Sequence, residues 1–127
     1  MDNRPRTSPD IVLLGTEWRL RALLCAQLIE QGLDVRAADT WDATRRLLRP
    51  GVRPVLAVVD LQGLPHPDRV LDELAVVMKP SRVIVLTAIG TVSPDDIRTR
   101  GFHVLGRPIP ISDIVAAAVR VIGEEKS

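Results

Sequence analysis

Short apolar runs alternate along the chain with longer segments in which apolar residues recur at helical spacing. The run 11–14 (IVLL) ends at Gly15, and the run 55–59 (VLAVV) ends at Asp60. Continuous apolar runs of this length are typical of strands that a sheet buries on both faces. Further strand candidates are 35–38, 83–86 and 104–105.

The segments between these runs carry helix signals. Apolar spacing predicts helices over 17–31 and 68–79, the first ending at Gly32 and the second at Pro80. The predicted inner faces are Leu20, Leu23, Leu24 and Leu28 in the first helix, and Val70, Leu71, Leu74, Val77 and Met78 in the second. A helix capped by Asp39 or Thr40 should bury Ala43, Leu47 and Leu48. A short helix after Ser93 and a nearly all-apolar helix from Pro110 to about Gly123 complete the set.

Strands that alternate with helices predict an α/β domain with a parallel sheet and helices on both faces. The carboxyl ends of the strands meet at one edge of such a sheet, where α/β proteins bind their ligands. The polar or flexible positions expected at this edge are Gly15, Thr16, Glu17, Asp60, Thr87 and Arg107.

A chain of 127 residues has room for one domain, which we place at 10–123 between a flexible tail at 1–9 and a C-terminal tail at 124–127. The apolar stretches are much shorter than the roughly 20 residues that span a bilayer, so we expect no membrane contact. Cys25 is the single cysteine, which excludes an internal disulfide and favours a reducing, cytoplasmic setting.

Charge and composition argue against several function classes. Lys and Arg number 17 against 16 Asp and Glu, and the arginines are spread along the chain, so no nucleic-acid surface is indicated. Aromatic residues make up 2%, too few for a base-stacking platform. His66 has no metal-ligand cluster around it in sequence, so we expect no metal site there. A nucleotide-binding loop is weakly supported, because Gly15 is the single glycine of the fingerprint.

In their order along the chain these pieces resemble the receiver domain of bacterial two-component response regulators. The resemblance covers about 10–122 and rests on the first helix, the apolar strand ending at Asp60, and several short matches. These are Leu64-Pro65, Leu86-Thr87-Ala88, Gly101 and Arg107-Pro108. It implies a flavodoxin-like, doubly wound five-stranded parallel sheet of order 2-1-3-4-5 and a role in phosphorelay signal transduction.

The resemblance also implies roles for residues at the sheet edge. Asp60 matches the aspartate that accepts a phosphoryl group, and Thr87 matches the hydroxyl that contacts it. Arg107 stands where the family has a lysine, and the Arg107-Pro108 peptide bond is expected to be cis. From the residues alone, Asp60 could instead cap nearby backbone amides, and Arg107 could be its counter-ion.

This chain departs from the family where the metal would bind. Gly15 and Thr16 occupy the positions of the acidic pair that holds magnesium, so we expect no cofactor, with magnesium only weakly supported. Glu17, one residue further on, could compensate or could simply be an acid in the first turn of a helix. Val104 matches the position of the family's switch aromatic residue.

The sequence therefore predicts a stand-alone, non-enzymatic signalling module with a degenerate phosphorylation site that acts through protein contacts. The expected partners are a histidine kinase, another regulator, or a second copy bound through the face formed by the last two helices. The alternative is a functional phosphoacceptor receiver that is phosphorylated on Asp60.

Overall fold

Residues 8–126 are described by the computed structural model, and a parallel five-stranded sheet runs through their centre. The strands lie in the order β2-β1-β3-β4-β5, as predicted. Their bounds are β1 Ile11–Leu14, β2 Val35–Ala38, β3 Leu56–Asp60, β4 Val83–Leu86 and β5 His103–Leu105. This order puts β1 and β3 at the middle of the sheet, so their carboxyl ends are adjacent.

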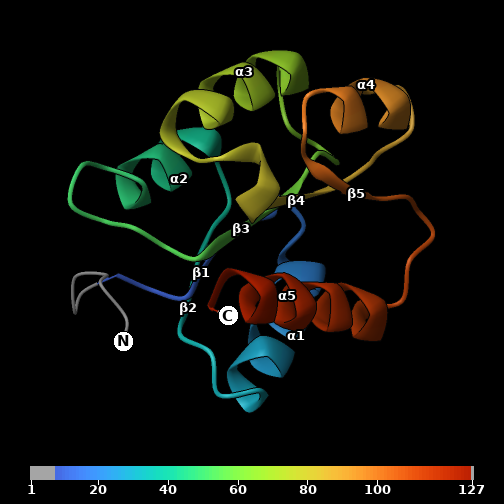
Figure 1. Ribbon diagram of the computed structural model, residues 1–127. Helices are drawn as coiled ribbons and strands as arrows, with labels where there is room; N and C mark the ends of the chain where they lie inside the picture. Colours follow the sequence, from blue (N-terminus) through green and yellow to red (C-terminus); the bar gives the residue numbers. More distant parts are fainter. Residues whose placement is uncertain (1–7, 127) are drawn as a thin grey trace.

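Helices cover both faces of the sheet. They are α1 Trp18–Glu30, α2 Trp41–Leu47, α3 Pro67–Val77, α4 Pro94–Thr99 and α5 Ile111–Lys126, with a short 3₁₀ helix η1 Pro80–Arg82 before β4. Figure 1 shows α1 and α5 on one side of the sheet and α2, α3 and α4 on the other. This is the layering that right-handed crossovers produce.

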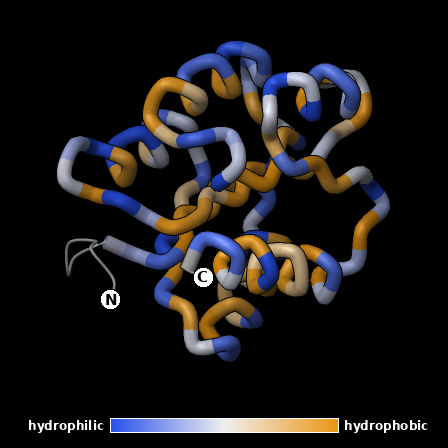
Figure 2. The backbone as a smooth tube through the Cα atoms, in the orientation of Figure 1, coloured by the Kyte–Doolittle hydropathy of each residue, from blue (hydrophilic) through white to orange (hydrophobic). Residues whose placement is uncertain are grey.

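Alternate residues of the central strands divide the core between these two layers. Val12 and Val59 belong to the cluster that includes residues of α3, whereas Leu13 and Val58 pack with residues of α1 and α5. All four of these side chains are at least 99% buried. The apolar colouring of Figure 2 is accordingly concentrated in the middle of the molecule. A strand that must bury both faces has no polar position, which explains the continuous apolar runs.

The described fold includes residues on both sides of the predicted domain at 10–123. Ser8 is buried, and its hydroxyl accepts a hydrogen bond from the Arg53 N–H at 2.9 Å. Helix α5 continues to Lys126, so 124–126 are helical and not a separate tail. The first seven residues of the predicted tail lie outside the described residues. Among the helices described, none is both long and apolar enough to cross a membrane.

Two of the predicted inner-face residues are exposed, one in α1 and one in α3. Leu23 is 52% exposed, because Leu24 and Leu28 form the buried stripe of α1 and the preceding position points away from it. Val77 is 46% exposed at the end of α3, beyond the last buried residue, Leu74.

Helix α2 buries a polar residue that the apolar pattern could not indicate. Thr44 is completely buried, and its hydroxyl donates to the Thr40 carbonyl at 2.8 Å. The hydrogen bond within the helix removes the cost of burying the hydroxyl. Of the predicted inner face, Leu48 is buried and Ala43 and Leu47 are half-buried.

The outer face next to α5 is less apolar than its sequence indicates. Ile114, Ala118 and Val121 are buried, which leaves Val119, 42% exposed, as the larger apolar side chain on the outer side. Helix α4 begins with the predicted Ser93 cap and buries Ile97, and it presents mainly charged side chains to solvent.

Candidate functional site

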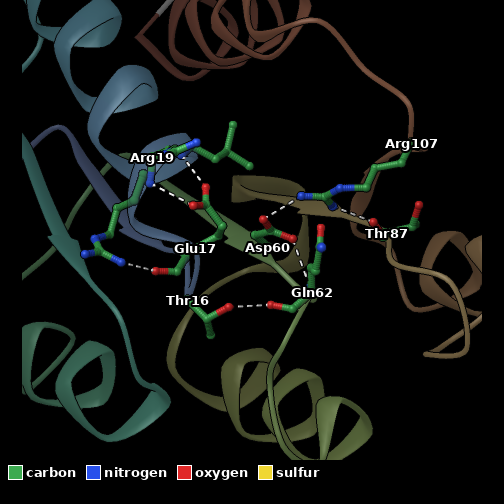
Figure 3. A network of polar contacts seen from close by, with 10 residues as sticks. Thr16, Glu17, Arg19, Asp60, Gln62, Thr87 and Arg107 are labelled. Carbon is green, nitrogen blue, oxygen red and sulfur yellow. Dashed lines mark hydrogen bonds and ion pairs between the residues drawn. The ribbon is translucent and has the colours of Figure 1, made fainter.

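The ends of β1, β3 and β4 bring together the polar residues expected at the carboxyl edge. Figure 3 shows Thr16, Glu17, Asp60, Thr87 and Arg107 around this edge, from four separate segments of the chain. Asp60 is the last residue of β3, and Thr87 directly follows β4. The parallel topology therefore assembles the site that the sequence predicts, and its contacts determine what it can do.

Asp60 has both of its carboxylate oxygens occupied by protein donors. One oxygen, Oδ2, accepts from Nη2 of Arg107 at 2.6 Å, and Oδ1 accepts from the backbone N–H of Gln62 at 2.9 Å. The Asp60 side chain is only 2% exposed. Both structural alternatives raised by the sequence are present at once, because the carboxylate caps a local amide and pairs with Arg107.

Arg107 joins three segments of the chain through one guanidinium group. Besides Asp60, it contacts the carbonyl oxygen of Thr87, to which Nη1 donates at 2.6 Å. It thereby links the ends of β3 and β4 to the loop that follows β5. The planar, multi-donor shape of arginine allows these bonds in different directions, which a lysine ammonium would meet less rigidly. The Arg107-Pro108 bond is cis, as the resemblance implies.

Thr87 takes part in this network through its backbone. Its N–H donates to the carbonyl of Leu105 at 3.0 Å, and its own carbonyl accepts from Arg107. The residue is buried, at 8% exposure. The guanidinium of Arg107 is thus the link between Thr87 and Asp60, and a phosphoryl contact of the Thr87 hydroxyl remains a prediction.

Thr16 closes a second contact across the same edge. Its hydroxyl donates to the carbonyl of Gln62 at 2.7 Å, which ties the loop after β1 to the loop after β3. The next residue, Gly63, has φ of +77°, and a Cβ there would lie 2.5 Å from the Thr16 Oγ1. Both the backbone conformation and the close approach require glycine. Gln62 and Gly63 were missed in the sequence, although the glycine within 61–65 (LQGLP) was a signal.

The remaining two edge residues are also used internally. The carbonyl of Gly15 accepts from Nη1 of Arg21 at 2.7 Å. The Glu17 carboxylate accepts from the N–H groups of Arg19 at 3.1 Å and Leu20 at 2.7 Å, so Glu17 is the N-cap of α1. These backbone hydrogen bonds lower the pKa of Glu17 below its ordinary value. This geometry favours a helix-capping acid over a compensating metal ligand.

The donor set at this edge does not fit a magnesium ion. Mg²⁺ requires hard oxygen ligands in octahedral array, usually including carboxylates. Asp60 is already paired with Arg107, Glu17 caps its own helix, and Gly15 and Thr16 supply no carboxylate. Within residues 8–126, no group of three or more His, Cys, Asp or Glu side chains is arranged to hold a metal.

A cavity of about 530 Å³ adjoins the edge between α2 and α3. Thr16 and Gly63 form its border with the edge, but Asp60, Thr87 and Arg107 are not among its lining residues. Across it, the Trp41 indole N–H donates to the Glu73 carboxylate and links the two helices. The Asp60 carboxylate therefore does not line this cavity.

Comparison with known proteins identifies the fold of this chain. No family model matches the chain, and no curated protein does. Among solved structures, the signal receiver domain from Vibrio parahaemolyticus is 22% identical with a TM-score of 0.77, over 94% of this chain and 93% of that one. A response regulator receiver domain from Methanospirillum hungatei is 15% identical with a TM-score of 0.78, over 94% and 98%.

A third solved structure extends the same likeness. The receiver domain of a Francisella response regulator is 16% identical with a TM-score of 0.76, over 92% of this chain and 98% of that one. All three structures match nearly end to end, while the identities lie far below those of close relatives. Together with the strand order and the edge at which Asp60 lies, they show that this chain has the fold of response regulator receiver domains.

Proposed function

We propose that this chain is a receiver-type signalling domain whose output is independent of phosphorylation at Asp60 and passes through contacts with other proteins. The observation that carries the proposal is the buried ion pair between Asp60 and Arg107. A receiver site with its carboxylate already neutralised has the framework of a phosphorylation switch without a free nucleophile.

The chemistry of phosphoryl transfer explains why this pair matters. A carboxylate nucleophile must present a free oxygen to phosphorus, and cations must neutralise the charge that develops on the phosphoryl oxygens. Here Oδ2 of Asp60 is held by Arg107 and Oδ1 by the Gln62 amide. The guanidinium occupies the charge-neutralising role from inside the fold, and the carboxylates that would recruit a metal are absent at Gly15 and Thr16.

The second candidate is a functional phosphoacceptor receiver, and the position of Asp60 at the end of β3 favours it. Phosphorylation would then require the guanidinium to leave Oδ2 and turn toward the incoming phosphoryl group. Arg107 could follow such a movement, since its side chain is 24% exposed. We favour the first function because opening the pair would leave a buried carboxylate with a single hydrogen bond.

Candidate partners are a histidine kinase, another regulator, or a second copy bound through α4 and α5. Val119 is exposed on that face, but α4 contributes charged side chains beside it. A dimer formed through α4 and α5 would bury a small apolar area around Val119, with the charged side chains of α4 next to it. Light scattering during gel filtration measures this association, and a monomer at high concentration would contradict it.

The test is the intact mass after incubation with magnesium and acetyl phosphate. We expect no phosphoryl increment in the native protein or in Asp60→Asn. A variant that combines Gly15→Asp, Thr16→Asp and Arg107→Lys restores the acidic pair and the lysine, and serves as the positive control. An increment in the native protein that disappears in Asp60→Asn would contradict the proposal and establish the second candidate.

A further inference from the structure

A cavity of about 240 Å³ lies at the opposite end of the sheet from Asp60. Its walls come from the end of α2, the segment leading into β3, the end of α3 and η1. Figure 1 shows the segment between α2 and β3 on the same side of the molecule as the start of the described chain. The residues here are far along β3 from the Asp60 edge, so they form a separate feature.

The cavity combines an apolar wall with a basic rim. Leu48, Val52, Val77 and Met78 provide the apolar wall. Arg53, Lys79 and Arg82 provide the basic rim, and the lining contains no acidic residue. A concave apolar surface with charge of one sign at its rim is suited to an amphipathic partner of opposite charge.

Two of the three rim cations are not neutralised by any residue that the structure describes. Within residues 8–126, neither Arg53 nor Lys79 has an ion-pair partner, and both residues are exposed. Arg82 is different, because its Nε donates to the Glu125 carboxylate of α5 at 2.9 Å. The contact between Arg82 and Glu125 shows that a cation of this rim can bind a carboxylate. Arg53 and Lys79 remain available to carboxylates of another molecule.

The size of the cavity favours a single side chain over a drug-sized ligand as its occupant. Sites for drug-sized ligands and cofactors usually enclose about 300–1,000 Å³. At about 240 Å³ this cavity is below that range, and it suits an apolar side chain from a partner. A nucleic-acid backbone would use the cations but leave the apolar wall unfilled. The chain's own first seven residues carry Arg4 and Arg6 against Asp2, the wrong sign for this rim.

We infer that this surface binds an acidic peptide segment of a partner protein, with one apolar side chain in the cavity and flanking carboxylates on Arg53 and Lys79. The inference rests on the proposed function only in that the domain acts through protein contacts. It adds a place and a chemistry for one such contact, which the Asp60 edge does not provide.

The experiment titrates the ¹⁵N-labelled protein with a capped peptide of glutamates and glycines around one central leucine. We expect amide shifts centred on Val52, Arg53, Met78 and Lys79. Lys79→Glu and Arg53→Glu should each weaken binding by about tenfold, and Val77→Ser by several-fold. Arg19→Glu, a matched charge reversal on the distant α1, should leave binding unchanged.

Control ligands decide between chemistries. A peptide with lysines in place of the glutamates should not bind, and one with serine in place of the leucine should bind more weakly. Unchanged binding in Lys79→Glu and Arg53→Glu would overturn the inference, and so would equal binding of the leucine and serine peptides. Tighter binding of a short DNA duplex would overturn it in favour of nucleic acid. Any of these results leaves the acetyl phosphate test of Asp60 untouched, so the two proposals fail separately.

Discussion

The two ends of the sheet treat their polar groups in opposite ways. At the carboxyl edge, Asp60, Arg107 and Thr16 all have partners inside the domain. At the amino end, Arg53 and Lys79 surround an apolar cavity, and no ion-pair partner for them exists in the described part of the chain. Removing one partner of an internal charge pair lowers stability, whereas charges exposed to solvent are available to a partner protein.

This contrast separates the framework of a site from its activity. The edge that the fold makes suitable for chemistry is the one that the side chains have closed. The amino end of the sheet, where this fold has no expected ligand site, carries the unpaired cations Arg53 and Lys79. Substitutions at the carboxyl edge should therefore lower stability, whereas substitutions of the rim cations at the amino end should hardly change it.

The largest effect is expected from Arg107→Ala. It leaves the buried Asp60 carboxylate without its counter-ion, and removing one partner of a buried pair costs about 3 kcal/mol of unfolding free energy. Urea denaturation measures this change. Arg107→Lys, which keeps the charge but not the fork of donors, should cost about 1 kcal/mol. A loss below about 0.5 kcal/mol in Arg107→Ala would show that the pair does not hold the edge closed.

Gly63→Ala should come next. The new Cβ would meet the Thr16 hydroxyl oxygen at 2.5 Å, and φ of +77° is strained for alanine, so we expect a loss of about 2 kcal/mol. Thr16→Ala removes that oxygen. In the double variant the two losses should therefore be less than additive in a double-mutant cycle. Strict additivity would mean that the two loops are not interlocked.

A smaller, pH-dependent effect is expected from Glu17→Gln. The pKa of Glu17 is lowered from 4.5 by the backbone N–H groups of Leu20 and Arg19. Its contribution to stability is thus present above pH 4.5 and disappears as the pH falls through the folded-state pKa. Thermal unfolding should show a larger melting-temperature difference from the native protein at pH 7 than at pH 3. Glu30→Gln, at the other end of α1, should not lower stability at either pH.

The smallest effect on stability is expected where the charges are unpaired. Lys79→Glu and Arg53→Glu should each change the unfolding free energy by less than about 0.5 kcal/mol, because no ion pair is broken within the described domain. The same urea measurement checks this. A large loss in either variant would show that the rim is structural, and would remove the contrast between the two ends.

The sequence predicts the fold well because its signals are local. A strand buried on both faces must be apolar throughout, and the turns between elements are marked by Gly32, Pro80 and the Ser93 cap. These features support the resemblance to receiver domains, and the resemblance implies the strand order 2-1-3-4-5. The structure confirms this order. The prediction was wrong at Leu23 because this position lies outside the stripe of α1 formed by Leu24 and Leu28, and at Val77 because it lies at the end of α3, beyond the last buried residue.

The candidate site was harder to predict because its state depends on contacts distant in sequence. The positions of Asp60 and Arg107 follow from the strand ends, and their pairing was one of two open interpretations. The Thr16 bond to Gln62 joins residues 46 apart, and no local pattern marks it. The basic rim was missed for the same reason, because Arg53 and Lys79 are brought together only by the packing of α3 against the segment before β3.

The interlock of Thr16 with the loop after β3 has a consequence for how this sequence can change. An aspartate at position 16 would lose the donor to the Gln62 carbonyl and turn a carboxylate toward a carbonyl oxygen, while Arg107 still held Asp60. An acid at that position therefore gains nothing alone, and neither does a lysine at position 107. On the function proposed above, we expect single substitutions at position 16 or 107 to lower stability without making Asp60 phosphorylatable. In evolutionary terms, several substitutions would have to occur together to free the Asp60 carboxylate, so selection on single substitutions would tend to keep the edge closed.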